Sequence, residues 1–138
     1  MKRSKHFKIE ELVSKEVFNL IKEDVLWKLF DDKLLETIDA LKEKFPEGSM
    51  TINNWLWNGD RSQSGLRTKD SKYYSPTSQH SIGKAIDCVF SDYDNDSARQ
   101  YVINNPDEFP YIKGIELDVS WCHFDVRNRD KVLLFSKG

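Results

Sequence analysis

The segment Ser78-Gln79-His80-Ser81-Ile82-Gly83-Lys84-Ala85-Ile86-Asp87-Cys88-Val89-Phe90 joins a long polar stretch to a short apolar one. Lys84 to Phe90 is typical of a β-strand, and Gly83 permits a turn just before it at low steric cost. His80 therefore stands at the entrance of the strand and Asp87 within it. The two side chains can converge if the chain turns between them.

The residues before this segment divide into a helical half and a loop. Residues 7–45 show a helical pattern, and its clearest part is an amphipathic stripe that Asp31 or Asp32 can cap: Leu34, Leu35, Ile38 and Leu41. Residues 50–57 are rich in β-formers and predict a strand. Residues 57–79 form a polar loop of about twenty residues, a length that is usually functional in a compact domain.

The residues after it predict one further helix and then strands. Asn95 or Asp96 can cap a short helix that runs to about Ile103. Residues 112–118 and 121–127 are typical of strands that could pair as a hairpin, and residues 132–135 of a last short one. Helices first and strands later predict an α+β fold, with the N-terminal helices packed on a small, mainly antiparallel sheet. The length of 138 residues predicts one domain, 1–138.

Composition excludes several classes of function. The formal net charge of −2 gives no basic field for nucleic acid. No apolar run approaches the roughly 20 residues that membrane insertion needs, and no apolar signal region begins the chain. We therefore expect synthesis in the cytoplasm; the oligomeric state stays open. Cys88 and Cys122 are too few for a disulfide scaffold, and strand alternation predicts that both are buried free thiols.

The second chemical motif is Trp121-Cys122-His123-Phe124-Asp125-Val126-Arg127, which contains the last of three histidines. A catalytic zinc site takes three protein ligands and keeps one position open, and His80, Asp87 and His123 would supply such a set. Ala85 shares the strand face of Asp87 and leaves room for a metal. Spacing alone does not favour a metal site over the alternative that His80 and Asp87 are ordinary polar residues at loop ends with hydrogen-bond partners of their own.

Taken together, the two motifs resemble a known family. Ser78-x-His80-x-x-Gly83-x-Ala85-x-Asp87 followed by Trp121-x-His123-x-Asp125 is similar to the signature of the zinc D-Ala-D-Ala carboxypeptidases. That family includes phage endolysins that cut the L-Ala-D-Glu bond and, distantly, the hedgehog signalling domain. The resemblance implies a hedgehog/DD-peptidase-like fold and a Zn²⁺ ion bound by His80, Asp87 and His123.

The resemblance also implies substrate-binding residues in the long loop. The family places an arginine after a Ser-Gly pair, and Ser64-Gly65-Leu66-Arg67 makes Arg67 the candidate, with Arg61 second. A guanidinium can hold a peptide carboxylate or steady an oxyanion. We also expect Ser78, Tyr73 and Tyr74 to contact the substrate.

The general base is where the sequence departs from the family. Several relatives carry a carboxylate three residues before the last histidine ligand, where this chain has Ser120. The nearest upstream carboxylates are Asp118 and Glu116. In one ideal strand neither would share the face of His123, but a turn or bulge near residues 119–120 could re-aim Asp118. Asp118 is therefore the expected base and Glu116 the alternative.

These features predict a zinc metallopeptidase that acts on peptidoglycan stem peptides, as a phage or prophage lysin or a tail-associated protein. Action on the cell wall would follow release from the cell or assembly into a virion. Two alternatives remain: a zinc-binding module of the same fold without turnover, which Ser120 keeps open, and a structural phage protein without metal.

Overall fold

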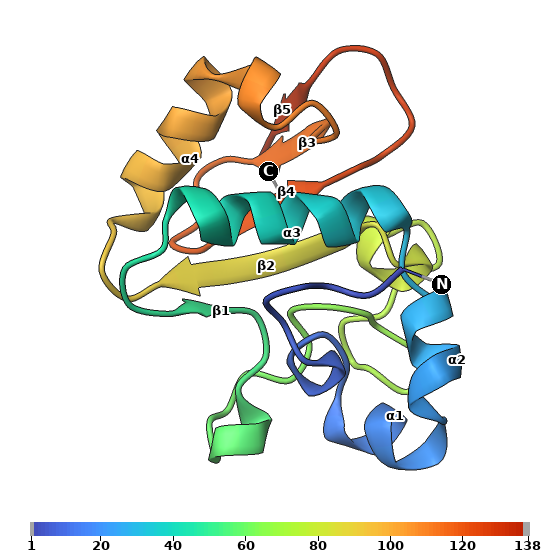
Figure 1. The fold of residues 1–138 in the computed structure, drawn as a ribbon. Coiled ribbons are helices and arrows are strands. Elements are labelled where there is room, and N and C mark those ends of the chain that lie inside the picture. The colour runs from blue at the N-terminus through green and yellow to red at the C-terminus, as the bar shows by residue number, and fades with distance from the viewer. Residues whose placement is uncertain (1, 137–138) are drawn as a thin grey trace.

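The computed structural model describes residues 2–136 and has an α+β architecture, as the sequence predicts (Figure 1). Its α-helices are α1 (Lys15–Leu20), α2 (Glu23–Lys28), α3 (Asp32–Lys44) and α4 (Asn95–Asn104). Its strands are β1 (Met50–Thr51), β2 (Ala85–Phe90), β3 (Gly114–Glu116), β4 (Cys122–Asp125) and β5 (Leu133–Phe135). Short 3-10 helices are η1 (Ile9–Glu11), η2 (Trp55–Trp57), η3 (Gln79–Ile82) and η4 (Pro106–Glu108).

The strands form one mixed sheet in the order β1-β2-β4-β3-β5. β2 and β4 are antiparallel and pair Ala85 with Asp125, Asp87 with His123 and Cys88 with Cys122. β3 is antiparallel to β4 and forms the expected hairpin, whereas β5 runs parallel to β3. The centre of the sheet therefore joins the two sequence motifs directly.

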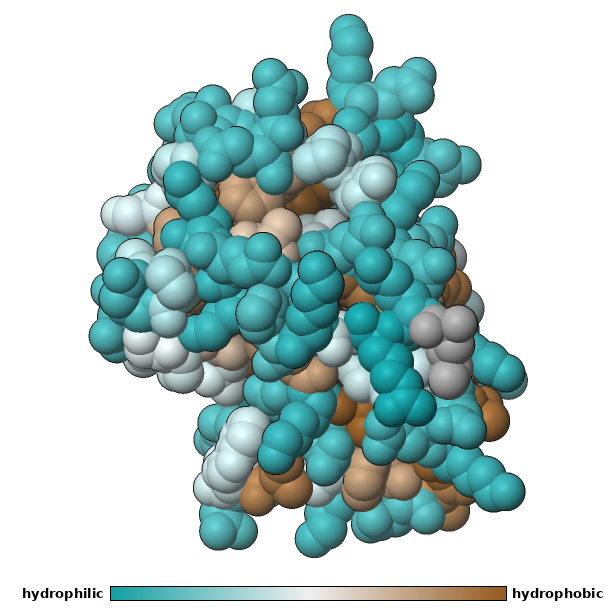
Figure 2. Space-filling view, viewed as in Figure 1, coloured by the Kyte–Doolittle hydropathy of each residue, from teal (hydrophilic) through white to brown (hydrophobic). Residues whose placement is uncertain are grey.

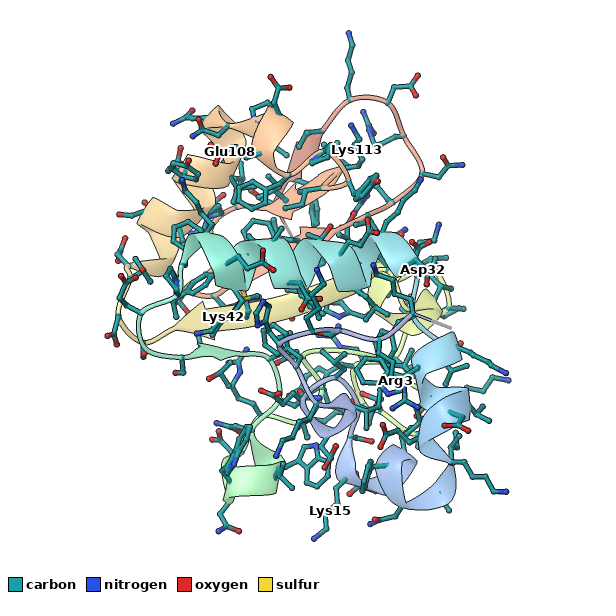
Figure 3. All side chains as sticks on the ribbon, in the orientation of Figure 1. Arg3, Lys15, Asp32, Lys42, Glu108 and Lys113 are labelled. Atoms are coloured by element: carbon teal, nitrogen blue, oxygen red, sulfur yellow. The ribbon has the colours of Figure 1, made fainter. Side chains whose placement is uncertain are left out.

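Helix α3 covers one face of this sheet (Figure 1). Its apolar stripe (Leu34, Leu35, Ile38 and Leu41) is buried in the same cluster as Ile86, Cys88 and Phe124. The predicted cap is present, because the Asp31 side chain accepts a hydrogen bond from the Lys33 amide at 2.8 Å. Asp32 and Lys42, near opposite ends of α3 in Figure 3, suit the helix dipole. Strand alternation then leaves Asp87 and His123 on the sheet face opposite α3.

Two predicted elements differ from those observed. The strand predicted over residues 50–57 ends at Thr51, because Asn53 leaves the sheet and bonds to the N-terminal segment. Its amide N–H donates to Glu11 O at 2.9 Å and its side chain to Val13 O at 3.0 Å. The cap of α4 is Asp94 rather than Asn95 or Asp96, and its carboxylate accepts from the Ser97 amide at 2.9 Å.

Gly83 connects the N-terminal helices to the segment that carries His80 and Asp87. It has a φ of +71°, and a Cβ built on it would lie 1.9 Å from Leu29 O. Its own carbonyl accepts a hydrogen bond from the Asp31 amide at 2.9 Å. Gly83 is thus required both for its left-handed backbone and for the close approach of the α2–α3 corner.

The face of the molecule that carries α3 is mostly hydrophilic (Figure 2). Exposed apolar side chains lie mainly on the short helices, such as Leu20 and Val25. None of the helices in residues 2–136 has the length and apolar character needed to cross a membrane.

Candidate metal centre

The centre of the site is a row of side chains that crosses the sheet from strand to strand. Asp87 on β2 is paired with His123 on β4. β3 and β4 pair Gly114 with Asp125 and Ile115 with Phe124, so the same register places Glu116 opposite His123. Glu116 is in turn paired with Phe135 on β5. Residues directly opposite each other share a face of the sheet, so Asp87, His123 and Glu116 project to the same side.

His80, Asp87 and His123 form a compact and buried group that could hold a metal ion. Each offers one ligand atom, and these atoms all lie within 4.8 Å of one another. Asp87 Oδ1 lies 3.3 Å from His80 Nε2 and 3.0 Å from His123 Nδ1. Tetrahedral ligands at about 2.0–2.2 Å from zinc lie roughly 3.3–3.6 Å apart. These two separations lie close to that range, so the donor set is compatible with a zinc ion.

Both histidine rings are oriented by hydrogen bonds from their second nitrogen. His80 Nδ1 lies 3.0 Å from Gly65 O, to which its N–H can donate, which leaves Nε2 for a metal. His123 Nε2 lies 2.7 Å from Asp125 Oδ2, which leaves Nδ1 for a metal. Such carboxylate and carbonyl partners fix the tautomer of metal-binding histidines.

Asp125 is itself held by Arg127. The guanidinium donates from Nε to Asp125 Oδ1 and from Nη2 to Asp125 Oδ2, both at 2.7 Å. A Cβ on Gly114 would lie 2.2 Å from Asp125 Oδ1, so this position needs a glycine to make room for the carboxylate. Both residues lie in the second sequence motif, but the sequence does not predict the ion pair between them.

Arg67 lies at the site but contacts a candidate metal ligand. Its Nη2 donates to Asp87 Oδ2 at 3.1 Å, and its Nε donates to Gln63 O at 2.8 Å. The arginine thus occupies the Asp87 oxygen that does not face the histidines. It orients the carboxylate, a role that the sequence did not predict.

The charged groups of the centre shift one another's protonation. Burial raises the pKa of Asp87, but hydrogen bonds from His123 and His80 outweigh it and hold that pKa well below its usual range. Burial lowers the pKa of His123, but hydrogen bonds to Asp125 and Asp87 raise it to about 9. Burial raises the pKa of Asp125, and hydrogen bonds from Arg127 and His123 bring it down to about 2. Without metal and near neutral pH, Asp87 and Asp125 are therefore ionised and His123 is protonated.

The group opens into a cleft of about 970 Å³. The long loop supplies one wall, and the predicted substrate residues Arg67, Tyr73, Tyr74 and Ser78 all line it. The Ser78 hydroxyl accepts a hydrogen bond from the His80 amide at 3.2 Å, so it also caps η3. The long polar loop therefore forms one wall of the cleft that contains the candidate metal centre.

Asp118, the expected base, is placed elsewhere. It is exposed, has a φ of +61°, and its Oδ2 accepts a hydrogen bond from Ser136 Oγ at 2.6 Å. It is not among the residues that line the cleft, whereas Glu116 is. The expectation that neither residue shares the face of His123 treated residues 116–123 as one strand. The hairpin reverses the chain, so Glu116 lies beside His123 and the turn carries Asp118 away.

Both cysteines lie on the core side of the sheet, as strand alternation predicted. Cys88 and Cys122 are buried free thiols, and they stand opposite each other in the register of β2 and β4. Cys122 Sγ donates to Asn95 O at 3.2 Å. Neither belongs to the metal-ligand group found in residues 2–136.

The comparisons with known proteins add no assignment: no family model, no curated protein and no solved structure matches the chain.

Proposed function

We propose that the protein is a zinc-dependent peptidase that hydrolyses an amide bond in bacterial peptidoglycan stem peptides, as a phage or prophage lysin or a tail-associated component. One observation carries the proposal: a buried His80, Asp87 and His123 group shares a cleft with the carboxylate of Glu116. The motif resemblance supplies the substrate class and the hedgehog/DD-peptidase-like fold.

His80, Asp87 and His123 would hold the zinc ion, which when bound supplies Lewis acidity that polarises a carbonyl and acidifies water. Glu116 Oε2 has no hydrogen-bond partner among the described residues. The Glu116 side chain lines the cleft beside the metal ligands, and in this proposal its carboxylate accepts a proton from the attacking water and passes it to the leaving amine. Arg67 and Asp125 keep Asp87 and His123 in place and are positioning residues.

The second candidate is a zinc-binding module of the same fold without turnover. Ser120, which stands where several relatives of the resembled family carry their carboxylate, favours it. Glu116 favours the enzyme, because it brings a carboxylate to the cleft from another position of the hairpin.

Metal content and hydrolysis test the proposal separately. Purified protein should hold close to one zinc ion, and His123→Ala should lose it, whereas His6→Ala should keep it. His6 is the matched control because it lies outside the cleft and pairs with Glu43. Full zinc occupancy in a His80→Ala, His123→Ala double variant contradicts the metal site.

The zinc-loaded protein should release new amino groups from peptidoglycan, and a chelator should stop the release. If fully loaded protein releases none from peptidoglycan or soluble stem peptides, the enzyme proposal fails and the binding module replaces it.

A further inference from the structure

Unpaired buried polar atoms gather in the cleft. Within residues 2–136, three buried side-chain atoms have no hydrogen-bond partner: Gln79 Oε1, Glu116 Oε2 and Trp121 Nε1. All three residues line the same cleft. Buried polar groups are nearly always paired, and an unpaired one costs about 1–3 kcal/mol. Proton transfer accounts for Glu116, but nothing in the proposed reaction uses Gln79 or Trp121.

Gln79 and Trp121 are close in sequence to metal ligands, and the backbone carbonyl of each accepts a hydrogen bond. Gln79 begins η3 and precedes His80, and its carbonyl accepts from the Lys84 amide at 2.9 Å. Trp121 lies two residues before His123. Its carbonyl accepts from Nη1 of the buried Arg99 at 2.7 Å. The two residues thus belong to the two motifs that carry the metal ligands, and both line the cleft that contains those ligands.

The two atoms are chemically complementary to a peptide. An indole Nε1–H can only donate a hydrogen bond, and an amide Oε1 can only accept one. Each peptide unit of a bound chain offers a carbonyl acceptor and an N–H donor. Both protein atoms are shielded from water in the ligand-free protein, so a ligand must shift a lining side chain to reach them. Because the two protein atoms make no hydrogen bonds to water before binding, they lose none when they bond to the ligand.

We propose that Trp121 Nε1 and Gln79 Oε1 determine the specificity of the cleft for a peptide main chain: Trp121 donates to a substrate carbonyl or carboxylate oxygen, and Gln79 accepts from a substrate amide N–H. The proposal rests on the proposed peptidase function. When buried polar groups of a site form hydrogen bonds with the substrate, an analogue that lacks the matching group leaves them unpaired and is strongly rejected.

Peptide binding tests the proposal without requiring turnover. The parent is zinc-loaded Glu116→Gln protein, and the ligand is a soluble stem peptide whose binding is measured by calorimetry. Adding Trp121→Phe or Gln79→Met should weaken binding about tenfold or more, with zinc content unchanged. Trp57→Phe is the control, since Trp57 is 58% exposed and lies outside the cleft.

Ester analogues of the peptide distinguish a direct contact from a structural role. Each analogue replaces one amide by an ester and so lacks one N–H. The parent should discriminate against one of them, and Gln79→Met should remove that preference. Affinity equal to that of the Glu116→Gln parent in both variants, or an unchanged amide preference in Gln79→Met, overturns the inference. If the parent itself binds no stem peptide, the substrate class of the proposed function fails, and this inference fails with it.

Discussion

Replacing Glu116 by glutamine is the most informative single perturbation of the proposed active site. Loss of a general base typically lowers the rate by about 10²–10⁴-fold, which corresponds to roughly 2.7–5.5 kcal/mol in activation free energy. The change is nearly isosteric. Oε2 has no partner among residues 2–136, so no hydrogen bond to that oxygen is lost. Zinc content and the free energy of unfolding should therefore stay close to wild type while kcat falls.

The assay is the rate of amino-group release from peptidoglycan by protein of measured zinc content. Asp118→Asn is the matched control, because Asp118 is exposed and bonds only to Ser136 in the described structure. It should change the free energy of unfolding by no more than about 0.5 kcal/mol and leave the rate within about twofold. A Glu116→Gln protein with wild-type kcat, or a large loss in Asp118→Asn alone, refutes Glu116 as the base.

Three further outcomes follow from the contacts around the metal ligands. Arg67→Ala should weaken zinc binding about 10–100-fold, measured by competition with a chromogenic chelator, because it frees Asp87 from its orienting bond; unchanged affinity contradicts that role. The pKa of His123 is about 9 in the fold and ordinarily 6.5. Its contribution to the stability of metal-free protein should therefore be complete below about pH 6.5 and lost as pH rises through about 9, and thermal melts against pH should show a decline that His123→Asn abolishes. Thiol reagents should label Cys88 and Cys122 slowly in native protein and completely after unfolding, since both are buried; rapid native labelling contradicts this.

The sequence predicted the parts of the site that depend on local pattern. His80 and Asp87 flank a recognisable turn and strand, and His123 lies in a second short motif. The structure brings all three within 4.8 Å. The long loop was recognisable by its polarity and length, and the α3 stripe by its helical period. Each of these signals lies within about twenty consecutive residues.

The features that the sequence did not predict depend on pairing between distant segments. The position of Glu116 beside His123 is one of them, because alternation along a single strand puts the two residues on opposite faces, whereas in a hairpin the register depends on where the turn falls. The contact of Arg67 with Asp87 joins residues twenty positions apart, so no local pattern predicts it, and the expected contact of Arg67 with the substrate stays a prediction. Asn53 ended a predicted strand through bonds to Glu11 and Val13, which no local propensity reveals.

The close contact at Gly83 has a consequence for the order in which the molecule assembles. Gly83 lies between His80 and Asp87, and it is held against Leu29 and Asp31 at the corner between α2 and α3. An isolated fragment that begins after α3 would contain every metal ligand and yet lack the surface that fixes their spacing. High-affinity metal binding should therefore appear only after the two halves of the chain have docked. During refolding, metal uptake would report completion of the whole tertiary structure rather than formation of a local motif.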